Sequence, residues 1–336
     1  MSDKVLKAKN LAVVFNSRER QVHAVRGVDI EVNESEIVGI VGESGSGKSV
    51  AMKAVIGILP DNASLSADIL LLGDKNLNKL SEKEYQKVRG RDITMIFQDP
   101  MTALNPVIRV GRQLEEVIIR NSGLSKKEAR EKALEIFERV GIPSPKESIK
   151  RYPHEFSGGM RQRVLIAMAL SCNPKLLIAD EPTTALDVTI QAQILDLIKN
   201  MSKDIKTSVI LITHDLGVVA ETCDRVVIMY GGLVMETGNI EEIFYSPRHP
   251  YTMALLQAIP SIDMDEDERL KSIEGFPPSL TDPPKGCPFA ERCEFRMDIC
   301  DSKRPPVSAF SDTHSAMCFL NEEETENAFR RQKYGK

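Results

Sequence analysis

The chain has 336 residues, of which 42% are hydrophobic and 28% are charged, and its net charge is −5. This balance is typical of a soluble globular protein with room for two domains. The charge and the lack of a long basic run argue against sequence-independent nucleic-acid binding. No apolar run has the length of a membrane span, and the N-terminus MSDKVLKAKN lacks the apolar core of a secretory signal. We therefore expect a cytoplasmic protein that does not itself cross a membrane.

The first part of the chain reads as strands. Residues 4–41 alternate apolar and polar positions with turn residues between them, and 35–42 (SEIVGIVG) is a short apolar strand. A glycine-rich loop follows, and then a helical stripe of Val50, Ala54, Val55 and Ile58. Residues 92–97 (DITMIF) predict another buried strand.

The middle of the chain reads as a helical insertion into a parallel sheet. Residues 108–172 are mostly helical in pattern, and Ser125 with Glu128 predicts a capping box. Strand-like runs return at 175–180 (KLLIAD), 208–213 (SVILIT) and 225–230 (RVVIMY), with helical segments between them. This alternation predicts an α/β fold with helices flanking the sheet.

The composition changes near residue 261. Pro277, Pro278, Pro283 and Pro284 punctuate a loop-rich segment that also holds four cysteines, and the last residues are polar. We expect one domain over 1–260, with a helical subdomain at about 100–172, and a cysteine-rich extension with a polar tail over 261–336.

Residues 42–49 (GESGSGKS) match the phosphate-loop pattern G-x-x-x-x-G-K-[ST]. The glycines let backbone N–H groups face a polyphosphate, and the following helix directs its positive end at the same anion. We expect Lys48 to reach the β- and γ-phosphates and the Ser49 hydroxyl to bind Mg²⁺. The predicted nucleotide-binding residues of this loop are Gly42, Ser44, Gly45, Ser46, Gly47, Lys48, Ser49 and Val50.

Two acidic residues follow the apolar strand at 176–179. Such a strand delivers Asp180 and Glu181 to its C-terminal edge, where α/β proteins bind ligands. We expect Asp180 to hold Mg²⁺ through water and Glu181 to polarise an attacking water near the γ-phosphate. A solvated strand end is the alternative, which the phosphate loop disfavours.

The motifs in this order resemble the nucleotide-binding subunits of ABC transporters. After GESGSGKS come Gln98, FSGGMRQR (156–163), LLIADE (176–181), TTALD (183–187) and His214. The resemblance covers about residues 4–260 and implies a phosphate-loop NTPase (RecA-like) ABC core with an N-terminal antiparallel β subdomain and a helical insertion. It also implies a head-to-tail dimer, in which Ser157, Gly158, Gly159 and Met160 contact the ATP bound to the partner.

The resemblance also assigns roles to single residues. It implies that Gln98 contacts Mg²⁺ and the attacking water and that His214 hydrogen-bonds the γ-phosphate. It implies that Asp187 crosses the dimer interface, and Phe15 is a candidate to stack on adenine, although a strand Phe is more often a core residue. Two positions depart from the usual LSGGQ signature, Phe156 and Met160. Because Ser157 and both glycines remain, we expect function to survive.

Three further stretches resemble the ATPases of dipeptide, oligopeptide and nickel importers. They are QDPMTALNP (98–106), HPYTMALLQAIP (249–260) and the segment that contains the last four cysteines. These cysteines, Cys287, Cys293, Cys300 and Cys318, have the spacing C-x₅-C-x₆-C-x₁₇-C, which lacks the paired knuckles of zinc modules. Thiolates without histidines also suit an iron–sulfur cluster. The resemblance implies a 4Fe–4S cluster; zinc is the second choice and free thiols the third.

We therefore expect an ATPase subunit that powers di- or oligopeptide import, bound peripherally to the cytoplasmic face of the membrane. The implied partners are a second ATPase subunit, transmembrane permease subunits and, indirectly, an extracytoplasmic substrate-binding protein, with no nucleic acid. Nickel import and a soluble, non-transport ABC ATPase are the alternatives. An iron–sulfur electron carrier and a phosphate-loop kinase explain fewer of the motifs.

Overall fold

A computed structural model gives the structure of the chain and describes residues 4–17, 20–99, 103–184, 186–259 and 273–321. The predicted polar tail lies outside the described residues. The described strands are β1 (Lys4–Asn16), β2 (Gln21–Asn33), β3 (Ile37–Val41), β4 (Ala63–Ser66), β5 (Ile69–Leu72), β6 (Lys75–Asn76), β7 (Ile93–Ile96), β8 (Leu176–Asp180), β9 (Ser208–Thr213), β10 (Arg225–Tyr230), β11 (Leu233–Asn239), β12 (Val307–Ala309) and β13 (Ser315–Met317).

Four of the described α-helices are at least thirteen residues long. The bounds of all the described α-helices are as follows. They are α1 (Lys48–Val55), α2 (Glu82–Val88), α4 (Val110–Ser122), α5 (Lys126–Arg139), α6 (Pro145–Ser148), α7 (Gly158–Leu170), α8 (Val188–Asp204), α9 (Leu216–Thr222), α10 (Ile240–Tyr245), α11 (Pro250–Gln257) and α12 (Asp298–Ser302). Among the helices that the structure describes, none is both long and apolar enough to cross a membrane.

The larger sheet of the described residues has the order β12-β13-β11-β10-β3-β9-β8-β7. Within the run β10-β3-β9-β8-β7 the strands are parallel to one another, as the alternating pattern predicts, while the pairs β10-β11, β11-β13 and β13-β12 are antiparallel. In β9, Val209 and Leu211 enter one core, and Ile210 and Ile212 enter the core on the opposite face. Burial on both faces explains why these strands read as unbroken apolar runs.

A second, antiparallel sheet covers one face of the first. Its order is β2-β1-β5-β6, with β4 also paired to β1. The core between the sheets includes Ala51, Met52, Ala54 and Val55 of α1, so the helix that follows the phosphate loop is held between them. This confirms the expected N-terminal strands and the first helix.

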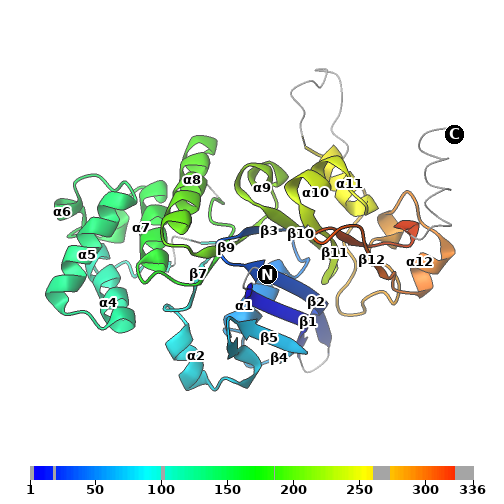
Figure 1. Ribbon diagram of the computed structural model, residues 1–336, viewed down its shortest axis with the longest axis horizontal. Coiled ribbons are helices and arrows are strands. Elements are labelled where there is room, and N and C mark those ends of the chain that lie inside the picture. Colours follow the sequence, from blue (N-terminus) through cyan, green and yellow to red (C-terminus); the bar gives the residue numbers. More distant parts are fainter. Residues whose placement is uncertain (1–3, 18–19, 100–102, 185, 260–272, 322–336) are drawn as a thin grey trace.

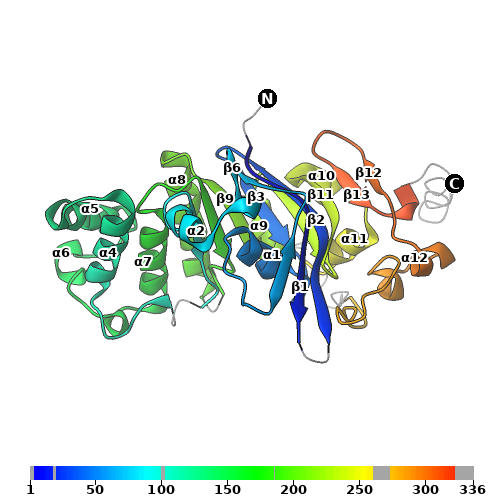
Figure 2. The same cartoon turned by 90° about the horizontal axis from the view of Figure 1, so that it is seen from below.

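The helical insertion lies at one end of the molecule and the C-terminal elements lie at the other (Figures 1 and 2). Helix α5 begins with the expected capping box of Ser125 and Glu128, and Phe137 is fully buried against neighbouring helices. Helix α7 runs from this lobe to the large sheet, and Ser157 caps its N-terminus. The insertion therefore holds the start of α7 on a part of the fold separate from α1.

The C-terminal segment contains two strands that the sequence did not predict. Strands β12 and β13 form an antiparallel pair, and β13 adds to β11 through the pairs Glu236 with Ala316 and Thr237 with Ser315. Both strands have three residues, too few for an alternating pattern to be visible in the sequence. Cys287 and Phe289 also enter the core that the large sheet shares with the helices. The segment is thus packed onto the large sheet and its helices.

A buried carboxylate joins these two parts. Glu236 on β11 is fully buried, and it accepts hydrogen bonds from the backbone N–H groups of Arg248 (2.6 Å) and His249 (2.9 Å). The third contact comes from the C-terminal segment, where His314 Nε2 lies 2.8 Å from Glu236 Oε1. An unpaired buried charge is costly, so the His314 contact stabilises both the strand pairing and the carboxylate.

We expect His314→Ala to lower the free energy of unfolding by about 2–4 kcal/mol, because it removes one of three partners of a buried carboxylate. Chemical denaturation followed by circular dichroism measures this change. Thr313→Ala is the control, because Thr313 is exposed and donates to the carboxylate of Glu242; we expect it to cost less than about 1 kcal/mol. Equal losses in the two variants would contradict the role given to His314.

Candidate active site

The phosphate loop lies between the end of β3 and the start of α1. Gly47 immediately precedes α1 with φ of 97°, a left-handed conformation that favours glycine. A Cβ atom at this position would lie only 2.4 Å from the carbonyl oxygen of Ala24, so a larger residue would displace the loop from β2. Ser44 and Gly45 are exposed at the tip of the loop, whereas Gly42 and Ser46 are buried.

The Lys48 side chain folds back along its own loop. Its ammonium donates to the carbonyl oxygens of Gly42 (2.6 Å) and Glu43 (2.8 Å), and Lys48 is only 6% exposed. Burial lowers the pKa of Lys48, and the nearby carboxylates of Glu181, Asp180 and Glu43 oppose that shift. The lysine is thus a buried cation beside an acidic strand end, a placement that suits an incoming polyanion.

Asp180 ends β8 directly beside the start of α1. The Ser49 hydroxyl donates to Asp180 Oδ1 at 2.7 Å, although the two residues are 131 positions apart in the sequence. Asp180 is 3% exposed, and burial raises its pKa, while the bond from Ser49 opposes the shift. A hydroxyl and a carboxylate in contact at a phosphate loop are the oxygen ligands that Mg²⁺ prefers.

Glu181 is held by side chains from three other segments. Its Oε2 accepts from the Gln98 amide at 2.7 Å and from the Thr184 hydroxyl at 3.0 Å, and its Oε1 lies 3.7 Å from Nδ1 of His214. The backbone of Glu181 has φ of 47°, an uncommon conformation for a residue with a Cβ atom. Such backbone is often found where a side chain must be aimed at a functional site.

Sequence reasoning predicted Gln98, Glu181 and His214 but not Thr184. The structure brings all four together at the carboxyl ends of β7, β8 and β9. Thr184 lies within the TTALD stretch, three residues after Glu181, and this short spacing was the available signal.

The signature residues lie at the start of α7, a helix separate from α1. Ser157 and Gly158 are exposed at the start of α7, and the Ser157 hydroxyl accepts from the backbone N–H of Met160 at 3.4 Å. A Cβ atom on Gly159 would lie 2.8 Å from Ile190 of α8, so the small residue permits close helix packing. Helices α7 and α1 lie apart in both views of the molecule (Figures 1 and 2).

Two other predicted residues have structural contacts of their own. Asp187 is exposed and caps α8, where its carboxylate accepts from the backbone N–H of Ile190 at 3.0 Å. Phe15 is half-buried near the end of β1 and packs against the core between the two sheets. Its assignment to adenine stays a prediction, as does the interface role of Asp187.

The four C-terminal cysteines line one small apolar cavity although they span 32 positions of the sequence. All four thiols are free, and Cys287, Cys300 and Cys318 are buried. Burial raises the pKa of Cys287 and Cys318 to about 12 and that of Cys293 to about 11. Within the described ranges, no three His, Cys, Asp or Glu side chains are close enough together to hold a single metal ion.

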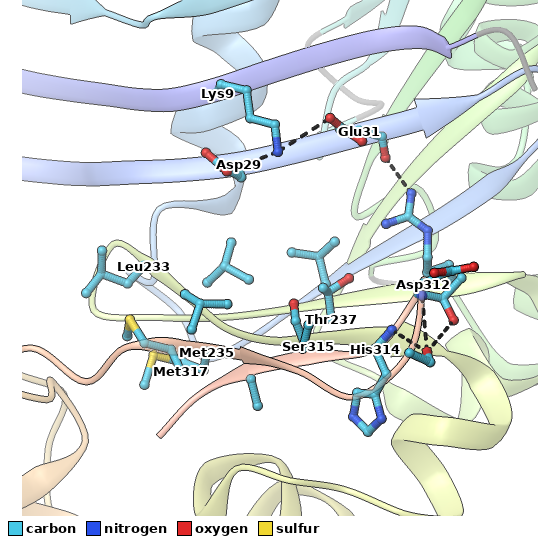
Figure 3. Close-up of a pocket in the computed structure, with 18 of the residues that line it drawn as sticks. Lys9, Asp29, Glu31, Leu233, Met235, Thr237, Asp312, His314, Ser315 and Met317 are labelled. Carbon is cyan, nitrogen blue, oxygen red and sulfur yellow. Dashed lines mark hydrogen bonds and ion pairs between the residues drawn. The ribbon is translucent and has the colours of Figure 1, made fainter. Parts of the chain in front are cut away.

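A larger cavity, of about 670 Å³, lies between β2 and strands β11 to β13 (Figure 3). Its apolar wall includes Leu233, Met235 and Met317. On the opposite side the Lys9 ammonium donates to Asp29 at 3.1 Å and lies 3.4 Å from Glu31. Lys4 also pairs with Glu31, so these two cations and two carboxylates neutralise one another. The cavity contains none of the predicted site residues, and we assign it no part in the candidate active site.

Comparisons with known proteins agree with this geometry. Residues 25–184 match the family model "ABC transporter", and residues 235–300 match "Oligopeptide/dipeptide transporter, C-terminal region". The chain is 52% identical to the dipeptide transport ATP-binding protein DppD of Bacillus subtilis over 97% of both chains. It is 49% identical to the oligopeptide transport ATP-binding protein OppD of Escherichia coli, over 96% of this chain and 95% of that one.

Solved structures show the same fold. The dimeric post-hydrolysis structure of the ATP-binding cassette MJ0796 bound to ADP and Pi is 28% identical, with a TM-score of 0.61, and covers 70% of this chain and 98% of that one. The cbiO1 protein of Clostridium perfringens, part of the ABC transporter complex cbiONQ, is 30% identical with a TM-score of 0.62. It covers 73% of this chain and 92% of its own.

Proposed function

We propose that this chain hydrolyses ATP to power the import of dipeptides or oligopeptides. The chain belongs to the family of ABC transporter ATP-binding proteins that includes OppD and DppD. The observation that carries the proposal is the contact of the Ser49 hydroxyl with the Asp180 carboxylate beside the buried Lys48 ammonium. This hydrogen bond joins the phosphate loop to Asp180 at the end of β8, next to Glu181.

The nucleotide would bind at the phosphate loop, with its phosphates facing the N-terminus of α1. Lys48 would exchange its two carbonyl partners for phosphate oxygens, which is feasible because both partners belong to the same loop. Ser49 and Asp180 would hold Mg²⁺ with Gln98 as a further oxygen ligand, and these oxygens fit the ion. When bound, Mg²⁺ neutralises charge on the β- and γ-phosphates.

Hydrolysis would use Glu181 as the base. A water oxygen attacks the γ-phosphorus while the bond from that phosphorus to the β–γ bridging oxygen breaks, and ADP leaves with the bridging oxygen. Glu181 takes the proton of the attacking water, and His214 orients the γ-phosphate. Gln98 and Thr184 both donate to Oε2 of Glu181 in this structure, so Oε1 is the oxygen that would accept the proton.

The second half of each site would come from a partner ATPase. Ser157, Gly158, Gly159 and Met160 would contact the partner's ATP, and the placement of Ser157 and Gly158, exposed at the start of a helix that is separate from α1, supports this division. Asp187 would cross the interface, and Phe15 would stack on adenine. A transport role, which the names of the relatives support, would require association with permease subunits at the cytoplasmic face of the membrane and, indirectly, with a substrate-binding protein. The same chemistry would serve a nickel importer or a soluble ABC ATPase.

We expect Glu181→Gln to keep ATP affinity within about threefold of wild type while lowering the hydrolysis rate by at least about 100-fold, because the amide cannot accept the proton of water. Steady-state phosphate release and equilibrium nucleotide binding measure the two effects. Lys48→Ala is the contrasting variant and should lose the binding itself. Undiminished turnover in Glu181→Gln would remove Glu181 as the base.

The transport role predicts stable partners. A tagged chain purified from its own cells in mild detergent is expected to bring multi-spanning permease subunits, identified by mass spectrometry, with or without a second ATPase. An accompanying binding protein would distinguish a peptide from a nickel system. Recovery of soluble partners alone would leave an ABC ATPase that does not serve a transporter.

We further propose that the residues from 261 onward form a distinct extension to an ATPase domain over 1–260, and that its cysteines hold a 4Fe–4S cluster, with zinc as the alternative. The four thiols converge on one cavity, and Cys287 N–H donates to the carbonyl of Cys300 at 2.8 Å, which holds two of them together. A metal centre requires thiolates, so it would have to displace protons that burial now favours.

An unpartnered histidine nitrogen supports a sulfur-bearing group at this site. His249 lines the same cavity and is 1% exposed, and its Nδ1 accepts from the backbone N–H of Tyr251 at 3.0 Å. A neutral ring therefore carries its proton on Nε2, and burial lowers the pKa of His249 to about 3, which keeps the ring neutral. In the described part of the chain that Nε2 has no hydrogen-bond partner, and a cluster would offer it a sulfur acceptor.

Anaerobically purified chain is expected to contain about four iron and four sulfide per molecule with visible absorbance near about 400 nm. Cys300→Ser should lose the iron, whereas Cys172→Ser should keep it, because Cys172 lies outside the cavity with its sulfur near Ser122 and Ser171. If the analysis finds about one zinc and no sulfide per molecule, the zinc site is correct and the 4Fe–4S cluster is not. A wild-type chain free of both metals would leave four free thiols.

A further inference from the structure

Arg292 connects the cysteine-rich segment to the phosphate loop. Its side chain is 6% exposed, and its Nη1 donates to Glu43 Oε2 at 2.8 Å and to the Tyr230 hydroxyl at 2.9 Å. Its Nε and Nη2 donate to the carbonyls of Glu274 (2.8 Å) and Ile273 (2.9 Å). The guanidinium also lies over the Tyr230 ring, 5.6 Å from its centroid. It is therefore committed to four acceptors and has little freedom to move.

Glu43 is the second residue of the phosphate loop, and each of its polar groups has a partner. Its carboxylate accepts from Arg292, its backbone N–H donates to the Tyr251 hydroxyl at 3.0 Å, and its carbonyl accepts from the Lys48 ammonium at 2.8 Å. Tyr251 belongs to α11 and Arg292 follows the core by more than 30 residues, so the loop is held from outside its own β-strand and helix.

These contacts differ in what an incoming nucleotide would do to them. Lys48 must leave the Glu43 carbonyl in order to meet a phosphate, so that bond is temporary. Arg292 is 6% exposed and is held by three further acceptors, so a nucleotide that displaces Lys48 can leave its bond to Glu43 in place. A persistent contact on one residue of a flexible glycine loop sets where the neighbouring N–H groups point.

We propose that Arg292 is a positioning residue for ATP binding: by holding the Glu43 carboxylate, it keeps the phosphate loop open in the conformation that receives the nucleotide phosphates. The inference rests on the proposed binding of ATP at this loop. Through the contact of Arg292 with Glu43, the cysteine-rich segment would affect the nucleotide site directly. None of the sequence motifs described above accounts for such an effect. Arg292 itself touches no substrate, and its effect passes through Glu43.

The test uses the purified full-length chain with Mg-ATP as the probe. Arg292→Met keeps the volume and apolar stem of the side chain but removes the donors, and we expect Kd and KM for Mg-ATP to rise about tenfold while kcat changes less than about twofold. Arg292→Lys should recover most of the affinity, because an ammonium can still pair with Glu43. Glu43→Gln removes the same ion pair by changing the residue on the loop. It replaces Arg292→Met as the test variant if Arg292→Met does not fold.

The double variant Arg292→Met with Glu43→Gln decides between positioning and general stability. If Arg292 acts through Glu43, the double variant binds Mg-ATP no more weakly than Arg292→Met alone. Arg296→Met is the matched control, because Arg296 lies in the same segment but pairs locally with Asp301 at 2.7 Å, and its Kd should equal that of wild type.

Two results would overturn the proposal: an unchanged Kd in both Arg292→Met and Glu43→Gln, or losses of affinity that multiply in the double variant. Equal weakening in Arg296→Met would overturn it as well, since the effect would then be general to the segment. A wild-type chain that binds no Mg-ATP would overturn the proposed function and this inference together. Wild-type binding that is insensitive to Arg292 overturns the inference alone.

Discussion

Parallel pairing of β3 with β9 and of β9 with β8 is the constraint on which the site depends. The register places Val41 beside Thr213 and Asp180 beside Ile212, so that three strands end at one edge of the sheet. The phosphate loop, the acidic pair and His214 each follow one of these ends. Because parallel strands need long connections, residues separated by more than 100 positions meet there.

In the state seen here, the main polar side chains of the candidate active site have hydrogen-bond partners within the chain. Lys48 is bonded to loop carbonyls, Ser49 to Asp180, and Glu181 to Gln98 and Thr184. The bonds of Lys48 and Ser49 would be exchanged for bonds to the nucleotide and Mg²⁺. Such exchanges conserve the number of hydrogen bonds, so differences in charge and geometry, rather than the count of bonds, determine how strongly the nucleotide binds.

Local patterns were sufficient for the parts of the molecule that depend on neighbouring residues in sequence. The glycine loop, the capping box of α5 and the apolar strands β8 to β10 are of this kind, and the structure confirms them. Partners brought together by tertiary packing were not visible. Arg292 carries no motif that points to Glu43, and β13 is too short to reveal its pairing with β11. The ordered set of motifs predicted the family because it reflects a whole site, whereas composition alone predicted only a loop-rich C-terminal segment.

The pairing of β13 with β11 also bears on how this protein could be cut or recombined. An excised core that ends near residue 259 would present the backbone of β11 as an open sheet edge, a feature that promotes pairing between chains and aggregation. It would also leave Glu236 without His314. Chimeras that exchange the C-terminal segment between relatives must therefore carry over matching residues on β11, since the pairing of the large sheet continues beyond the last of the ATPase motifs.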